Sequence, residues 1–366
     1  MLEFIVHGNL IIEQMLFNIQ DDQPSTKYWY SQVEQDMPEF NDETTDSQIM
    51  NSLINYLSFV LIVIKKQQIS IFQDQHGSIP VLFSQDCISI QQFYTGQFYL
   101  IPGLNIIDVV NEKFILNLSK RYNLMQISNY SLLESLENNI AEIVSRFDKI
   151  TLLFSGGIDS AILYTLFKKE VINKNKQLMC ITLECQDIMS EDSQIVKQFI
   201  KDQINPNIQF QFLVLQKQNY IEQTKSIQSL IYPLDFNIMN MNLSLVFHFL
   251  SQNQTIVISG LGPDEYLSGY KKKQSRESLV EKLYLRNCGR DFRVVNQNNS
   301  KLICPYLSQS ITQIFLASLE EDKKILRDLG KQLGLPDYIT QRNKRAAQFG
   351  SGISKFVKGE GYDMLQ

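Results

Sequence analysis

One short segment constrains the fold of this 366-residue chain more than any other. Residues 149–160 read KITLLFSGGIDS. The apolar run ends at Phe154, two glycines follow, and an acidic residue and a hydroxyl precede a second apolar pattern with helical spacing. This order predicts a strand, a glycine turn and the N-terminus of a helix. Because the first amides of a helix have no intrahelical partners and lie at the positive end of its dipole, the turn is suited to bind an anion.

Each residue type in this turn favours phosphate binding. The glycines let the backbone approach a ligand closely, the serines add hydroxyl donors, and Asp159 is placed to hold a Mg²⁺ ion that bridges phosphate oxygens. The segment is neither a lysine-containing P-loop nor a dinucleotide fingerprint. The alternative is a turn that joins strand and helix without binding a ligand. The predicted ligand-binding residues are Ser155, Gly156, Gly157, Asp159 and Ser160.

A second segment places glycines and carboxylates after another apolar run. Residues 255–270 read TIVISGLGPDEYLSGY. Gly260 and Gly262 are predicted to keep the approach to a ligand open, and Asp264 is predicted to be the second carboxylate for the metal that Asp159 binds. Taken alone, this segment would be interpreted as an acidic loop.

The two segments together resemble loops of known families. The first resembles the Ser-Gly-Gly-x-Asp-Ser loop of the ATP pyrophosphatases, enzymes that split ATP between its α- and β-phosphates and adenylate a carboxylate or carbonyl oxygen. The second resembles the Gly-Glu-Gly-Ser-Asp-Glu-x-x-x-Gly-Tyr segment of the asparagine synthetase family. The resemblance implies the ATP pyrophosphatase fold, binding of ATP and a dependence on Mg²⁺.

Three later segments extend the resemblance to asparagine synthetases. The sequences RDFRV at 290–294 and CPYL at 304–307 resemble the Arg-Asp-Asp-Arg and Pro-Phe-Leu-Asp segments of that family. Residues 344–352, KRAAQFGSG, resemble its C-terminal basic segment in the form found in the asparagine synthetase domain-containing protein 1 subfamily. The resemblance implies that Lys344 or Arg345 neutralises charge on pyrophosphate, and the spacing leaves open which of the two does so. A solvated basic turn is the alternative.

Strands and helices alternate through the region that contains the first two segments. The strands predicted from apolar runs are residues 149–154, 178–183, 208–215 and 255–259. With helices between them, these strands predict an α/β fold with a doubly wound parallel sheet, which binds ligands at the carboxyl ends of its strands. Beyond Tyr266 the chain is predicted to be mostly helical. We expect the ATP pyrophosphatase domain at residues 126–366, and a smaller α+β domain with its linker at residues 1–125.

The N-terminal region resembles an amidotransferase domain without its catalytic residues. Residues 74–82, DQHGSIPVL, resemble the Asp-x-x-Gly-x-x-Pro-Leu hairpin of glutamine amidotransferase domains that have an N-terminal nucleophile. Such domains need a cysteine directly after the initiator methionine, whereas this sequence begins Met1-Leu2, and its first cysteine is Cys87. No arginine precedes Arg121. We therefore expect a degenerate, truncated domain of this fold without glutaminase activity.

Composition excludes several classes of partner. A net charge of −5 and a pI near 5.4 give no long-range attraction to nucleic acid or anionic lipid. The longest mainly apolar stretch, residues 57–64, is too short to span a bilayer. The five cysteines have no metal-ligand spacing, so we expect reduced thiols in the cytoplasm, where the partners are ATP and a small carboxylate or amino-acid substrate.

Two functional hypotheses follow, and a third is disfavoured. In the first, the chain is an AMP-forming carbon–nitrogen ligase that adenylates a carboxylate and passes it to ammonia or an amine. In the second, it is an inactive protein that keeps the fold as a nucleotide-binding or interaction module. A relative that modifies a tRNA base is disfavoured by the acidic pI. Leu261 and Asn240 stand where asparagine synthetases carry Glu and Asp, so we expect at most weak asparagine synthetase activity. Neither the acceptor nor the oligomeric state follows from the sequence.

Overall fold

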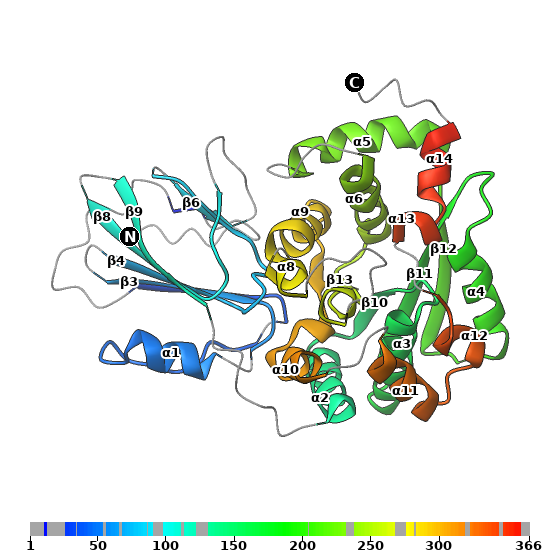
Figure 1. Ribbon diagram of the computed structural model, residues 1–366, viewed down its shortest axis with the longest axis horizontal. Helices are drawn as coiled ribbons and strands as arrows, with labels where there is room; N and C mark the ends of the chain where they lie inside the picture. Colours follow the sequence, from blue (N-terminus) through cyan, green and yellow to red (C-terminus); the bar gives the residue numbers. More distant parts are fainter. Residues whose placement is uncertain are drawn as a thin grey trace.

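The computed structural model describes most of the chain in two structural parts. The described residues are 11–12, 26–33, 35–53, 56–65, 68–85, 87–90, 98–110, 113–121, 131–203, 205–231, 238–267, 276–281, 283–318, 323–343 and 347–359. The described residues up to 121 form antiparallel sheets and one helix, called here the N-terminal part, and those from 131 onward form a parallel sheet with helices, called the C-terminal part. Figure 1 shows the two parts side by side.

The N-terminal part contains two antiparallel sheets and a helix. The first sheet has the order β2 (Thr26–Ser31), β3 (Phe59–Lys65), β4 (Gln68–Gln73), β8 (Leu104–Val110) and β9 (Lys113–Lys120). The second has the order β1 (Ile11–Ile12), β6 (Ile88–Ile90), β5 (Val81–Phe83) and β7 (Phe98–Tyr99), and the helix is α1 (Asp46–Ser52). Six successive residues of β3 are buried because both of its faces are covered. Alternate residues Val60 and Ile62 pack toward the second sheet, whereas Phe59 and Leu61 pack against α1.

The C-terminal part is built on a five-stranded parallel sheet. Its order is β12 (Ile208–Leu215), β11 (Gln177–Cys185), β10 (Lys149–Leu153), β13 (Ile256–Ile258) and β14 (Lys301–Ile303). From β10 the chain adds strands first on one side and then on the other, so the strand order reverses between β10 and β13. The predicted doubly wound parallel sheet, preceded by a smaller α+β region, is therefore confirmed. The described chain beyond Tyr266 is mostly helical, as expected, and β14 is a three-residue strand that was not predicted because it gives little periodic pattern.

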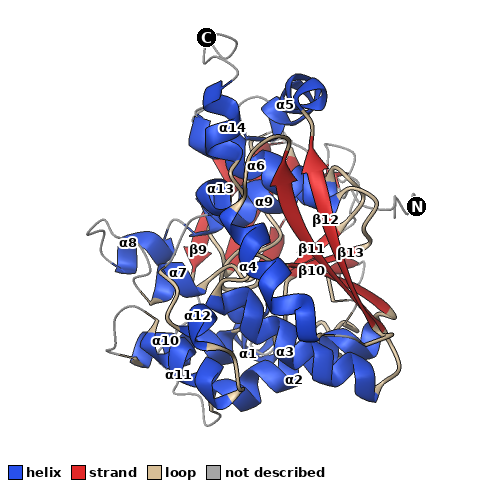
Figure 2. Ribbon diagram, turned by 90° about the vertical axis from the view of Figure 1, so that its right-hand side faces the viewer, coloured by secondary structure: helices blue, strands red, loops and turns tan. Residues whose placement is uncertain are grey.

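Helices cover both faces of this sheet, as Figure 2 shows. On β11, Cys180 belongs to the apolar cluster that includes α2 (Leu132–Arg146) and α3 (Ile158–Asn173). Its neighbour Ile181 packs with α5 (Lys217–Ile231) and α6 (Ile238–Ser251) on the other face. The helix α2 begins at a capping box in which Ser131 and Glu134 bond each other's backbone amides. None of the described helices has the length and apolar content needed to cross a bilayer. The helices are α2 (Leu132–Arg146), α3 (Ile158–Asn173), α4 (Glu191–Phe199), α5 (Lys217–Ile231), α6 (Ile238–Ser251), α7 (Pro263–Tyr266), α8 (Arg276–Glu281), α9 (Gly289–Asn296), α10 (Gln309–Ala317), α11 (Lys324–Gln332), α12 (Asp337–Thr340), α13 (Ala347–Gly350) and α14 (Ile353–Gly359), with single turns at Ile200–Asp202, Tyr284–Cys288 and Pro305–Leu307.

The two parts contact each other through the loop after β4. His76 Nε2 lies 2.6 Å from the hydroxyl of Tyr266 on α7. Gln75 Nε2 donates to Thr312 Oγ1 on α10 at 2.7 Å. Phe292 of α9 packs into the apolar core between the two N-terminal sheets. Burial lowers the pKa of His76 to about 3, so this imidazole is neutral at physiological pH.

Candidate functional site

The loop between β10 and α3 has the backbone geometry of an anion-binding turn. Gly156 has φ +67°, and a Cβ at this position would lie 2.7 Å from Ile195 Cγ2, so only glycine fits. Gly157 is the N-cap of α3, and no side chain caps this helix. The hydroxyl of Ser160 accepts from the amide of Ser155 at 3.3 Å and donates to the carbonyl of Gly157 at 3.1 Å. These bonds fix the turn and leave the first amides of α3 to a ligand.

The second glycine-rich segment lies directly against this loop. A Cβ on Gly260 would lie 3.3 Å from Cβ of Asp159, so the two segments approach as closely as a glycine allows. Gly262 has φ +120°, and its missing Cβ would meet Leu307 at 2.7 Å. Asp264 follows at the start of α7. The strand order explains this proximity, because β10 and β13 are neighbours and their carboxyl ends lie at the same edge.

Lys323 joins the two predicted metal-binding carboxylates. Its Nζ lies 2.5 Å from Asp159 Oδ2 and 2.6 Å from Asp264 Oδ1. The lysine side chain is 3% exposed, and the aspartates are 19% and 22% exposed. Burial alone would lower the pKa of Lys323, but the charges and hydrogen bonds of the two aspartates outweigh burial and raise it above its ordinary value. The three residues form a charged triad whose aspartates are partly open to solvent.

Lys323 was not predicted from the sequence. It is the N-cap of α11 and has a left-handed backbone, with φ +56°. Lysine is unfavourable at a helix N-terminus, where the dipole is positive, and left-handed geometry is unusual for a residue other than glycine. A lysine directly before the helical apolar pattern of α11 is therefore a local inconsistency, and such inconsistencies concentrate at functional sites. A lysine at a helix start is visible in the sequence, but it does not indicate which distant carboxylates the lysine contacts.

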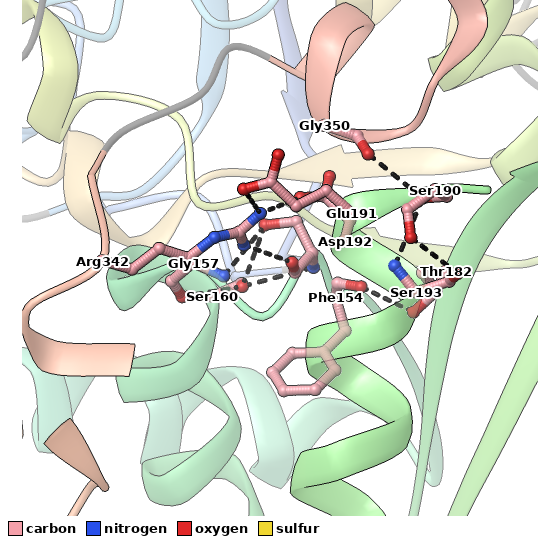
Figure 3. Close-up of polar contacts among 11 residues, drawn as sticks. Phe154, Gly157, Ser160, Thr182, Ser190, Glu191, Asp192, Ser193, Arg342 and Gly350 are labelled. Atoms are coloured by element: carbon pink, nitrogen blue, oxygen red, sulfur yellow. Dashed lines mark hydrogen bonds and ion pairs between the residues drawn. The ribbon is translucent and has the colours of Figure 1, made fainter. Parts of the chain in front are cut away.

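Arg342 links residues 155–160, called here the phosphate loop after their predicted ligand, to α4. Its Nη1 donates to the carbonyl of Ser155 at 3.1 Å, and its Nη2 lies 2.7 Å from Asp192 Oδ1. Figure 3 shows the guanidinium between the loop and the first residues of α4. A Cβ on Gly350 would lie 2.4 Å from the Asp192 carboxylate, so this glycine is required for the close packing. Lys344 and Arg345, the predicted phosphate-binding residues, lie outside the described residues.

One later segment of the family resemblance contacts the site directly, and another lies on α9. Tyr306 donates its hydroxyl to the carbonyl of Asp159 at 3.0 Å. Arg290 and Asp291 form a buried ion pair at 2.7 Å on α9, and Arg290 also lies 3.4 Å from Asn240 Oδ1. Burial raises the pKa of Asp291 to about 6, although the charge of Arg290 opposes the shift. Tyr306 therefore supports the first loop, whereas Arg290 links α9 to α6.

The carboxylates suit a magnesium ion that is bound together with a nucleotide. Among the described residues, no group of three or more His, Cys, Asp and Glu side chains is arranged to hold a metal. Mg²⁺ in nucleotide sites usually takes one or two protein carboxylates and fills its remaining positions with phosphate oxygens and water. Asp159 and Asp264 converge on one ammonium group beside the loop, which fits this requirement.

The sequence comparisons with known proteins agree on one family. The family model for asparagine synthase matches residues 131–312. The putative glutamine-hydrolyzing asparagine synthetase 1 of Methanocaldococcus jannaschii is 25% identical, over 72% of this chain and 55% of that protein. The human asparagine synthetase domain-containing protein 1 is 31% identical, over 29% of this chain and 20% of that protein. Among solved structures, the NMN synthetase of Francisella tularensis matches with a TM-score of 0.36 and 19% identity, over 63% of this chain and 87% of that one.

The matched region coincides with the parallel sheet and with most of the site. It begins at the capping box of α2 and includes both glycine-rich segments, while Lys323 and Arg342 lie beyond it. The chain spans about half the length of the curated relatives that it matches most extensively. The family match, the named relatives and the paired loops at the sheet edge together show that the chain belongs to the asparagine synthetase family.

Proposed function

We propose that the protein binds Mg²⁺-ATP at residues 155–160 and uses it to activate a carboxylate. In this reaction a carboxylate oxygen attacks the α-phosphorus, the bond to the β-phosphate breaks, and pyrophosphate leaves. The nitrogen of ammonia or of an amine then attacks the acyl carbon, loses a proton to solvent and displaces AMP. The observation that carries the proposal is the convergence of Asp159, Asp264 and Lys323 beside an uncapped helix N-terminus.

Each residue of the site has a role in this proposal. The loop amides and the hydroxyls of Ser155 and Ser160 would hold pyrophosphate, and Asp159 and Asp264 would hold the metal, which offsets charge on the phosphates. Lys323 would stay protonated, since its pKa is raised, and would add positive charge where the leaving group develops negative charge. Lys344 or Arg345 is proposed to contact the same phosphates.

The acceptor is proposed to be less polar than aspartate. Leu261 lies between the two glycines of the second segment, and a leucine cannot accept a proton from an attacking amine. Losing such general base assistance costs roughly 10²–10⁴-fold in rate. The same leucine supports the second candidate function, an inactive nucleotide-binding module.

The domain and cellular assignments belong to the same proposal. We place a degenerate amidotransferase-like domain and its linker at residues 1–125 and the ligase domain at residues 126–366. Met1 and Leu2 lie outside the described residues, so the absence of glutaminase activity stays a prediction. The described cysteines are free thiols, which suits the proposed cytoplasmic setting.

Calorimetry with Mg²⁺-ATP tests the binding step. We expect Asp159→Asn to weaken Mg²⁺-ATP binding about tenfold or more, because it removes a metal ligand and keeps the side-chain shape. Asp328→Asn is the matched control, since Asp328 lies in an exposed pair with Lys331 on α11. Equal affinity in the wild type and Asp159→Asn would contradict the site assignment.

Measuring AMP formation separates the two candidate functions. Purified protein with Mg²⁺-ATP, a panel of amino acids and other carboxylic acids, and ammonia or amines should release AMP and pyrophosphate with at least one acid. Binding of Mg²⁺-ATP without AMP formation across the panel would favour the inactive module. We expect little asparagine from aspartate and ammonia, and more of it in Leu261→Glu.

A further inference from the structure

The ammonium group of Lys323 lies where the two proposed metal ligands converge. Its Nζ is 2.5 Å from Asp159 Oδ2 and 2.6 Å from Asp264 Oδ1. Mg²⁺ binds carboxylate oxygens at about 2.0–2.1 Å. A Mg²⁺ ion bound to these same two oxygens would therefore lie within about 4.6 Å of Nζ. The lysine and the metal thus compete for the same two carboxylates.

The charges of the triad disfavour a metal ion that arrives alone. One ammonium group faces two carboxylates, so Mg²⁺ by itself would reverse the sign of the net charge. Because the Lys323 side chain is 3% exposed, water would offset little of the repulsion between the two cations. The phosphates of a nucleotide on the neighbouring loop would supply the negative charge that both cations need. A metal that arrives with a nucleotide is therefore favoured over a free metal.

The side chain of Lys323 is the part of the triad that can change partner. The hydroxyl of Tyr306 donates to the carbonyl of Asp159 at 3.0 Å and holds the backbone of this ligand in place. The carbonyl of Lys323 accepts from the amides of Leu326 and Arg327, which fixes its backbone at the start of α11. Beyond that backbone, a lysine has a flexible four-carbon stem. The ammonium group can therefore move from carboxylate to phosphate oxygens while the backbone stays in place.

We propose that Lys323 is an internal counterion that keeps free divalent metal out of the site, so that the metal enters together with the nucleotide. When the complex binds, the metal takes the two carboxylate oxygens and the ammonium group of Lys323 turns to the phosphates. The proposed metal role of Asp159 and Asp264 underlies this inference, which adds an order of binding to it. The competing possibility is a lysine that replaces the metal permanently.

Mn²⁺ binding without nucleotide tests the exclusion of free metal. Electron paramagnetic resonance of the full chain measures how much Mn²⁺ stays free in solution. We expect Lys323→Met to bind Mn²⁺ at least about tenfold more tightly than the wild type, because the competing charge is gone. Lys331→Met, which removes an exposed lysine of the same helix, is the matched control and should bind Mn²⁺ like the wild type.

Further variants locate the gained site and guard against misfolding. Adding Asp264→Asn to Lys323→Met should abolish the gain in Mn²⁺ affinity, since it removes one of the two ligands. Lys323→Gln, which is neutral but polar, should show the same gain as Lys323→Met. Mn²⁺ should also raise the thermal unfolding temperature of both single variants more than that of the wild type, which shows that the folded form binds the metal.

Calorimetry of the wild type with ATP separates this inference from the proposed function. If Mg²⁺-ATP binds but the Lys323 variants gain no Mn²⁺ affinity, the inference is wrong and the proposed function stands. If Mg²⁺-ATP does not bind but the variants gain a site that needs Asp264, Lys323 does exclude the metal and the proposed function is wrong.

Two results on the wild type alone would contradict the inference. The first is binding of Mn²⁺ at micromolar concentrations without nucleotide, because Lys323 then does not keep free metal out. The second is equal affinity for ATP with and without Mg²⁺, because Lys323 then replaces the metal permanently. Neither result depends on the stability of a variant.

Discussion

The two parts of the molecule bury apolar residues similarly but place their charged residues differently. In the C-terminal part all five strands are parallel, so their carboxyl ends share one edge, and the loops after β10 and β13 bring Asp159 and Asp264 to one lysine. In the N-terminal part neighbouring strands are antiparallel, so their ends are divided between two edges. Its buried ionisable groups, Asp74 and His76, lie where it meets the other part. Strand direction, more than charge content, therefore determines where a polar site forms.

The largest expected effect comes from breaking the charged triad. Lys323→Met should lower the free energy of unfolding by about 3 kcal/mol or more, because it leaves two partly buried carboxylates without their cation. Denaturant unfolding measures the change. Lys331→Met is the control, since Lys331 forms an exposed pair with Asp328 and should change stability by less than about 0.5 kcal/mol. Equal effects of the two substitutions would show that the charged triad stabilises the fold no more than an exposed ion pair does.

A second prediction concerns the contact between the parts. The pKa of His76 is about 3 when folded and near 6.5 when unfolded, so the unfolded chain binds more protons between these values. Stability from this group is present above pH 6.5 and is lost as pH falls. Relative to His76→Gln, the wild type should lose about 2 kcal/mol of unfolding free energy between pH 7 and pH 5.

The other titrating groups are the same in the wild type and in His76→Gln, so their contributions to the pH dependence of the unfolding free energy cancel in the difference. Asp291, whose pKa is raised to about 6, acts in the opposite direction, because its folded form binds more protons. Urea unfolding of both proteins at several pH values gives the required difference. If the difference in unfolding free energy between the wild type and His76→Gln is the same at every pH, the pKa of His76 is equal in the folded and unfolded chain, and the prediction is wrong.

The smallest expected effect isolates the packing of the phosphate loop. Gly156 and Gly334 both have positive φ, but only Gly156 has a neighbour within van der Waals reach of an added Cβ. Both substitutions to alanine should cost about 1 kcal/mol for backbone strain. Gly156→Ala should cost about 1 kcal/mol more, because its Cβ meets Ile195. Thermal unfolding of the two variants measures the difference, and equal losses would mean that α4 can move away from the loop.

The sequence was most informative where local pattern and local structure coincide. β10, β11 and β13 were predicted because buried parallel strands are mainly continuous apolar runs between turns. β12 lies at the sheet edge and is largely unburied, and its apolar residues still indicated a strand. β14 was missed because three residues contain too little periodicity. Lys323 was missed because its partners are distant in the chain, and local pattern does not encode distant pairing. The paired carboxylates were predicted only through two glycine-rich segments at neighbouring strand ends.

The charged triad also has a consequence for how the protein is made. Lys323 follows Asp159 by 164 residues, so the two can meet only after the intervening chain has been synthesised. Until α11 leaves the ribosome, Asp159 and Asp264 lack the ammonium group that neutralises them. Bringing their loops together before then would place two negative charges side by side. The loops after β10 and β13 are therefore expected to come together late, when nearly the whole chain has emerged.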